Sequence, residues 1–169
     1  MADATDGASG ARGASDPADG DEGLGPGVRA IDHTADVGLE IGAPDLPALF
    51  ARAAAGLEGL IGDRSDPNAP APDARQSAGT GELLLELDAP DVALLLADWL
   101  RELLYLRQVR RRALARVEFE ELSETRLGAR VATVAAPAHP VREIKGVTYH
   151  GLDVRRAGDG WRARVIFDV

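Results

Sequence analysis

Two segments of the sequence carry apolar residues at helical spacing, and they constrain the fold more than any other feature. Each segment follows an Ala-Pro-Asp tripeptide, so Asp45 and Asp91 stand where a helix N-cap is expected. Pro47 suits the first turn of the first helix, and Gly62 suits its end. The apolar positions are Leu46, Leu49, Phe50, Ala53, Leu57, Leu60 and Ile61, then Val92, Leu95, Leu96, Trp99, Leu103 and Leu106. Because each stripe needs a second layer to cover it, we expect two helices packed on a sheet.

Six further segments have the composition or the alternation of β-strands. They cover residues 29–43, 81–89, 114–122, 125–135, 146–156 and 160–169. The sequence AGDG joins the last two segments and is typical of a hairpin turn. In the last segment Trp161, Ala163, Val165 and Phe167 fall on one face. The expected order is β-α-β-α-β-β-β-β, which predicts a two-layer α+β fold with two helices on largely antiparallel sheet.

Two irregular segments lie outside these patterns. Residues 1–27 carry six acids and one arginine with no apolar periodicity, so we expect a disordered acidic tail. Residues 63–79 hold three prolines and no large apolar residue, which indicates a long loop. Residues 28–169 are then a single domain, and about 140 residues are enough to bury a core.

Composition excludes several kinds of site. The chain has no cysteine and only three histidines, far apart, so thiolate sites, disulfides and a histidine metal cage are not expected. No P-loop, dinucleotide fingerprint, nucleophile elbow or HExxH motif occurs. The net charge of −9 disfavours tight nonspecific binding of nucleic acid. Because no apolar run approaches about 20 residues and no secretory signal is visible, we expect a soluble, cytoplasmic protein with no membrane partner.

The sequence DHTAD, residues 32–36, places polar and titratable side chains inside a strand-like pattern. If one strand runs through it, Asp32, Thr34 and Asp36 share a face and His33 lies on the other. Oxygen ligands gathered on one face can bind a hard cation. The same residue types commonly cap turns and bulges, so a purely structural role is the alternative interpretation.

The C-terminal residues Asp168 and Val169 bring two anionic groups together, one from a side chain and one from the chain end. Solvated, frayed ends are the ordinary outcome for such residues. The last strand is strongly patterned to its end, however. If Asp36 lies beside it, the three carboxylates form a candidate site for Ca²⁺, Mg²⁺ or Mn²⁺.

Lys145 is the only lysine in the chain, whereas the other 18 basic residues are arginine. It lies in the segment EIKGVTYHG, five residues before His150, and His139 precedes the same segment. Lysine is a compact point charge, so a site that needs such a donor to a phosphate or carboxylate would not accept arginine. The alternatives are an ordinary surface lysine and a structural histidine.

Residues 107–116, RQVRRRALAR, form a basic run that could contact RNA or an acidic partner. The run has no interleaved aromatic residues, which weakens an interpretation as a single-strand binding surface. The alternative is the solvated end of the second helix and the turn after it.

Three of these segments, in order, resemble the archease family. That family has a [DE]HTAD[IVL]G segment, an H…(V/I)KA(V/I)TYH segment and a C-terminal DI or DV. This chain has DHTADVG at 32–38, EIKGVTYHG at 143–151 and FDV at its end, so the resemblance covers about Arg29 to Val169. One departure is Gly146, where the family commonly has alanine, and it removes no chemical group.

The resemblance implies an accessory protein that is not itself an enzyme. Archeases assist the GTP-dependent RNA ligase that joins 2′,3′-cyclic-phosphate or 3′-phosphate ends to 5′-hydroxyl ends in tRNA splicing or RNA repair. They promote guanylylation of the ligase and multiple turnover. By the same resemblance, Asp36, Asp168 and the terminal carboxylate of Val169 would bind a divalent cation, calcium in the family, and Lys145 would be needed for activation. His33 and His150 are further candidates.

The resemblance also implies contact with RNA only through the ligase, and nothing in the helix stripes demands a second copy, so we expect a monomer. One competing hypothesis is a metal-dependent phosphoesterase that uses Asp36, His150 and Lys145, although no clear nucleophile is present. Another is a binding or chaperone module that uses a metal only for stability.

Overall fold

The computed structural model describes residue 24 and residues 26–32, 36–62, 81–137 and 140–169 of the chain. The elements in that part are β1 (Val28–Asp32), β2 (Asp36–Ala43), α1 (Leu46–Ile61), β3 (Gly81–Asp88), α2 (Val92–Gln108), β4 (Arg112–Leu122), β5 (Arg126–Ala135), β6 (Gly146–Ala157) and β7 (Gly160–Asp168). The α+β class with helices between strands is confirmed. No helix within these ranges is long and apolar enough to cross a membrane.

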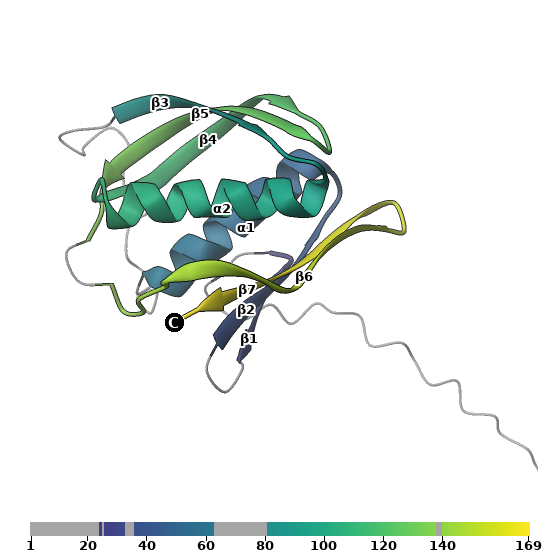
Figure 1. Ribbon diagram of the computed structural model, residues 1–169, viewed down its shortest axis with the longest axis horizontal. Coiled ribbons are helices and arrows are strands. Elements are labelled where there is room, and N and C mark those ends of the chain that lie inside the picture. Colours follow the sequence, from purple (N-terminus) through teal and green to yellow (C-terminus); the bar gives the residue numbers. More distant parts are fainter. Residues whose placement is uncertain (1–23, 25, 33–35, 63–80, 138–139) are drawn as a thin grey trace, which may run out of the picture.

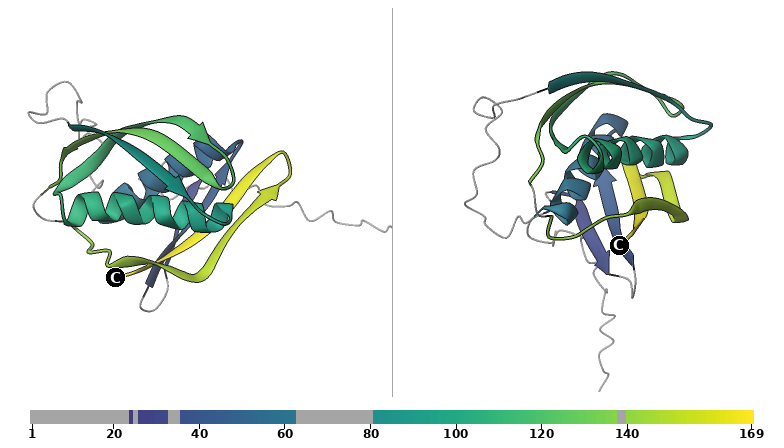
Figure 2. Two further views of the ribbon diagram at one scale, coloured as in Figure 1. Left: turned by 45° about the horizontal axis from the view of Figure 1, so that its top comes forward. Right: turned by 60° about the vertical axis from the view of Figure 1, so that its left-hand side comes forward.

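The strands form two antiparallel sheets, and the helices lie between them. One sheet has the order β1-β2-β7-β6 and the other β3-β5-β4. Figures 1 and 2 show α1 and α2 sandwiched between the two sheets. Helix α1 contacts β2 and β4, and α2 contacts β4 and β6, so each helix covers part of both sheets.

Both helices begin where the sequence predicts. The carboxylates of Asp45 and Asp91 accept hydrogen bonds of 2.8 Å from the backbone N–H groups of Ala48 and Leu94, as N-caps do. Gly62 caps the end of α1 through a backbone hydrogen bond to Glu58. The predicted stripes are buried apart from Val92, which is partly buried. Their burial supplies the main apolar driving force for placing the helices between the sheets.

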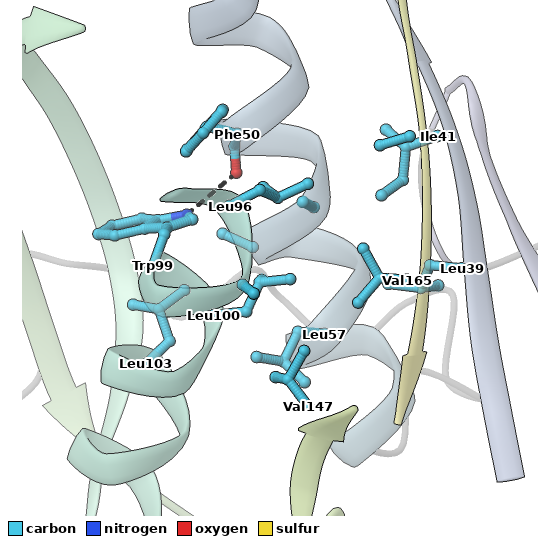
Figure 3. Packing of buried hydrophobic residues seen from close by; sticks show 14 of the residues in the cluster. Leu39, Ile41, Phe50, Leu57, Leu96, Trp99, Leu100, Leu103, Val147 and Val165 are labelled. Atoms are coloured by element: carbon cyan, nitrogen blue, oxygen red, sulfur yellow. Dashed lines mark hydrogen bonds between the residues drawn. The ribbon is translucent and has the colours of Figure 1, made fainter. Parts of the chain in front are cut away.

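Trp99 lies at the centre of the core and is fully buried. Its indole Nε1 donates to the backbone carbonyl of Phe50 at 3.3 Å (Figure 3). The ring of Phe119 meets it edge-on at a centroid distance of 5.8 Å. The two helices are thereby tied to each other and to β4, and the polar indole nitrogen has a partner inside the core.

The structure differs from the sequence predictions at three places and leaves others untested. The helices lie between two sheets, so the fold has three layers and not the two that were predicted. The segment 29–43, predicted as one strand, contains two strands that pair as a hairpin, with Asp32 opposite Val37. Residues 33–35 between them, the tail and the loop predicted for 63–79 lie outside the described residues. The basic run is not wholly solvated, because Arg107 is buried and paired with Glu58. The alternation predicted for β5 and β7 is confirmed.

Candidate functional site

Three segments far apart in the sequence meet at the end of β7. This strand lies between β2 and β6, and its register places Asp168 opposite Asp36 on one side and opposite Gly146 on the other. Residues paired across antiparallel strands project from the same face of a sheet. The carboxylates of Asp36 and Asp168 are therefore neighbours on one face. The cation site suggested by the sequence required this proximity of Asp36 to the last strand.

Lys145 is fixed to the same strand end by two hydrogen bonds. Its backbone N–H donates to the carbonyl of Asp168 at 2.8 Å. Its Nζ donates to a backbone oxygen of Val169 at 3.0 Å. Lys145 and Asp168 are exposed and Asp36 is partly buried, so the group lies at the surface. The single lysine of the chain is thus held at the last two residues, next to the position where Asp168 pairs with Asp36.

Glycine at position 146 leaves space beside Asp168. A Cβ added there would lie 3.9 Å from Asp168 Oδ2, an ordinary van der Waals distance. The alanine common in the resembling family would therefore fit at Gly146, and the departure from that pattern alters neither carboxylate.

The donor set at this end suits a hard cation such as Ca²⁺, Mg²⁺ or Mn²⁺ better than a softer metal such as Zn²⁺ or Cu²⁺. Carboxylate oxygens are the ligands that Ca²⁺ and Mg²⁺ prefer. Within the described residues, neither Asp36 nor Asp168 forms an ion pair, so two negative charges stand side by side without a cationic side chain bonded to either. No group of three or more His, Cys, Asp or Glu side chains that could hold a metal occurs in this part of the chain. A site here would need the carboxyl end of Val169 or ligands from a partner as well.

The histidines predicted as site residues are not all placed. His33 and His139, like Thr34, lie outside the described residues. His150 is exposed, and its backbone N–H donates to the hydroxyl of Thr148 at 3.0 Å. The structure therefore places Asp36, Lys145, Asp168 and Val169 together.

The strand that follows Lys145 contains a bulge that the sequence analysis did not predict. Thr148 pairs with Ile166 and Asp153 pairs with Arg164, so residues 149–152 stand opposite Val165 alone. Gly151 has a φ of 68°, in the left-handed region that favours glycine. The bulge projects residues 149–151 away from the regular ladder, and they are exposed.

Arg101 of α2 holds the start of this bulge, and sequence reasoning missed it. Its guanidinium donates to the carbonyl of Val147 at 3.0 Å and to the hydroxyl of Tyr149 at 2.7 Å. It also lies 4.2 Å from the centroid of the Tyr149 ring, a cation–π geometry. Asp98, one turn earlier, pairs with the same guanidinium at 3.0 Å. Arg101 thereby connects α2 to the segment that begins at Lys145.

Comparison with known proteins gives a consistent relationship. A family model described as the Archease protein family (MTH1598/TM1083) matches residues 29–169. Protein archease of Methanosarcina acetivorans is 32% identical over 148 residues, covering 82% of this chain and 93% of that protein. Protein archease of Archaeoglobus fulgidus is 31% identical over 147 residues, covering 83% of this chain and 98% of that protein.

Two solved structures have the same fold. The solution structure of Methanobacterium thermoautotrophicum protein 1598 matches with a TM-score of 0.60 and 23% identity, covering 85% of this chain and 99% of that one. The crystal structure of an archease, possible chaperone, from Thermotoga maritima matches with a TM-score of 0.53 and 23% identity, covering 82% and 94%. At this identity the two structures speak for the fold alone.

Proposed function

The chain belongs to the archease family, and from this premise we propose that it is an accessory protein that activates a GTP-dependent RNA ligase. The ligase would join 2′,3′-cyclic-phosphate or 3′-phosphate ends to 5′-hydroxyl ends. The accessory protein would promote guanylylation of the ligase and its multiple turnover. The observation that carries the proposal is the convergence of Asp36, Lys145 and Asp168 at one exposed sheet end.

The exposed position of this end suits insertion into a partner's active site. Guanylylation brings a triphosphate, metal and nucleophile together, so positioning and neutralisation of charge dominate its catalysis. The ammonium of Lys145 can donate to a phosphate oxygen from a defined place, because its backbone is bonded to β7. Arginine would present a wider planar fork in the same position.

The carboxylates of Asp36 and Asp168, with the carboxyl end of Val169, would hold a divalent cation, for which calcium is our first proposal and magnesium or manganese the alternatives. Such a cation supplies positive charge to phosphate oxygens or orders the sheet end. In this role the ligase carries out bond formation, and the accessory protein would contribute no catalytic residue of its own.

The charge of the chain suits a basic partner. The net charge of −9 favours approach to a protein that binds RNA through cationic surfaces, and the rate of such an encounter falls as salt rises. RNA would be contacted through the ligase.

The test is guanylylation of the ligase from the same organism with labelled GTP under multiple-turnover conditions. We expect stimulation by the wild type, loss of stimulation with Lys145→Ala, and no full recovery with Lys145→Arg. Arg162→Ala, which removes an exposed cation from β7, is the matched control and should stimulate like the wild type. Equal stimulation by Lys145→Ala would assign the activity to the carboxylates or the surface. Metal-dependent hydrolysis of a phosphoester without ligase would instead support an enzyme.

The Thermotoga maritima protein is described as a possible chaperone, which gives a second candidate function. In that case the protein would raise the yield of folded ligase, and Lys145→Ala would act like the wild type. Guanylylation of ligase that is already folded separates the two, because a folding chaperone would not raise its rate.

A further inference from the structure

A depression of about 510 Å³ opens where the C-terminal end of α2 meets the segment that leads into β6. Figure 1 shows these elements at the same end of the molecule as the C-terminus. The depression is lined by several residues. They include the apolar side chains Ile61, Leu104 and Ile144 and the cationic side chains Arg111, Arg142 and Lys145. The three apolar residues are largely buried and form the floor of the depression, whereas the three cationic residues are exposed and form its rim.

The rim is positively charged although the chain as a whole is acidic. Among the described residues, four cations and one carboxylate, Glu143, line the depression. One of the four, Arg107, is neutralised by its buried pair with Glu58. The remaining cations exceed the carboxylate by two charges, on a protein with a net charge of −9. A basic concave patch on an acidic protein attracts anions more strongly than the rest of the surface does.

Two of the cations are available to a ligand. Arg111 and Arg142 are exposed, and no described residue forms an ion pair or a side-chain hydrogen bond with either guanidinium. Lys145 differs, because its Nζ is bonded to Val169. The depression therefore offers two planar guanidinium groups, which bind phosphate oxygens in a bidentate manner.

The backbone of Arg111 is strained. Its φ is 55°, the only positive value of a non-glycine residue in the described part of the chain. Its carbonyl accepts a hydrogen bond of 2.9 Å from Ala136 across the depression wall, which fixes the conformation. Glycine would adopt this conformation without strain, and strained residues cluster at ligand sites. The arginine side chain is thus present at a position where the backbone alone would favour glycine.

We propose that this depression binds a nucleotide, with its phosphate on Arg111 and Arg142 and its base against Ile61, Leu104 and Ile144. The volume lies in the range of small-molecule sites and exceeds what a bare phosphate needs. An inorganic anion would make no use of the apolar floor. The amide of Gln108, which donates to Ile144 at 2.6 Å, lies in the same wall and supplies polar groups for the edge of a base.

The proposal concerns binding by the isolated protein, so it does not depend on activation of a ligase. The probe is 5′-AMP, with adenosine and inorganic phosphate as its two parts, titrated into ¹⁵N-labelled full-length protein and followed by NMR. We expect saturable shifts of the amides of Gln108, Arg111, Glu143 and Ile144. Phosphate and adenosine should each bind about tenfold more weakly than AMP or worse, because each makes only part of the contacts.

Two variants test the assignment. Arg111→Gly removes the guanidinium and relaxes the backbone, so AMP binding should weaken about tenfold while the melting temperature holds. Arg142→Ala should weaken binding to a similar extent, and Arg162→Ala on β7 should leave it unchanged.

Several results would overturn the proposal. Among them are no saturable shifts with AMP, shifts centred elsewhere, or equal affinity of the arginine variants. Binding of an acidic peptide such as polyglutamate without binding of AMP would assign the depression to a protein ligand instead. A fall in melting temperature for both arginine variants without any nucleotide binding would give these cations only the structural role of neutralising the helix ends.

Discussion

Asp36 on β2 lies directly opposite Asp168 on β7, so two carboxylates form one cross-strand pair at the end of both strands. Like charges in such a pair are destabilising by a few tenths to about 1 kcal/mol. A divalent cation between them would reverse the sign of this contribution. The stability of the sheet end should therefore depend on calcium, and the dependence should require both carboxylates.

Asp36→Asn tests this relationship. In the presence of EDTA the variant should melt at a slightly higher temperature than the wild type, because one of two like charges is gone. With calcium at about 100 times its Kd the wild type should gain about 2.7 kcal/mol, and the variant should gain far less. The measurement is thermal unfolding with EDTA and with calcium. Asp159→Asn, in the β6–β7 turn, is the control, and a calcium shift of equal size in Asp36→Asn would rule out the metal site.

The two glycines at positions 38 and 146 should respond oppositely to alanine. At Gly146 an added Cβ lies 3.9 Å from Asp168 Oδ2, and the residue has no positive φ, so Gly146→Ala should stabilise by about 0.5 to 1 kcal/mol. At Gly38 the Cβ would lie 2.7 Å from Ile166 Cδ1 and 3.1 Å from the carbonyl of Val165, so Gly38→Ala should destabilise. Urea unfolding of both variants measures the difference. A loss of stability in Gly146→Ala would contradict the geometry of the site.

The helices and most strands of this fold can be predicted from local sequence patterns, whereas the pairing of strands that are distant in the sequence cannot. Asp45 and Asp91 could be predicted as N-caps because the cap, the apolar stripe and the end signal are all local. The hairpin between β1 and β2 was missed because the polar residues of DHTAD fit both a strand interior and a turn. The AGDG turn predicts the pairing of β6 with β7, but the position of β2 on the other side of β7 depends on long-range packing and has no local signal in the sequence.

The same limit applies to the candidate site, because its residues can be predicted from local sequence but their arrangement cannot. Asp36, Lys145 and Asp168 stood out as charged residues in strand-like segments, but only the register places the two aspartates in one row. The role of Arg101 could not be predicted, since its partners Val147 and Tyr149 are 46 and 48 residues away. The bulge in β6 has one local sign, Gly151, and a glycine within a strand has several structural explanations.

Removal of only one partner of the ion pair between Glu58 and Arg107 should strongly lower the free energy of unfolding. Both side chains are largely buried, and the second oxygen of Glu58 accepts a hydrogen bond of 3.0 Å from the backbone N–H of Leu114. Glu58→Leu leaves a buried guanidinium and that N–H without their partner, so it should cost roughly 3 kcal/mol or more. Glu58→Gln keeps an acceptor for Leu114 and should cost less.

The double variant Glu58→Leu with Arg107→Met separates charge from packing. Replacing both partners by apolar side chains removes the unpaired charge, so much of the lost stability should return. Urea unfolding of the two single variants and the double variant gives the coupling. If the double variant is as unstable as the sum of its parts, the pair contributes through packing and not through charge compensation.

Arg101 should act as a positioning residue for the segment that begins at Lys145. Arg101→Ala removes the hydrogen bonds to Val147 and Tyr149 and the contact with the Tyr149 ring, so amides in residues 147–151 should exchange faster with solvent. Arg101→Lys keeps the charge but cannot make both hydrogen bonds in the same plane, so it should restore protection only in part. Arg155→Ala on the same strand is the control, because Arg155 pairs with Asp153 outside the bulge.

Hydrogen exchange and ligase guanylylation should then change together in the Arg101 series. If the bulge must be held for Lys145 to be presented correctly, stimulation should fall in the order wild type, Arg101→Lys, Arg101→Ala, with the melting temperature changed by only a few degrees. Faster exchange with undiminished stimulation would mean that the bulge is held for stability and plays no part in activation. Lost stimulation with unchanged exchange would place the guanidinium itself at the surface that contacts the ligase.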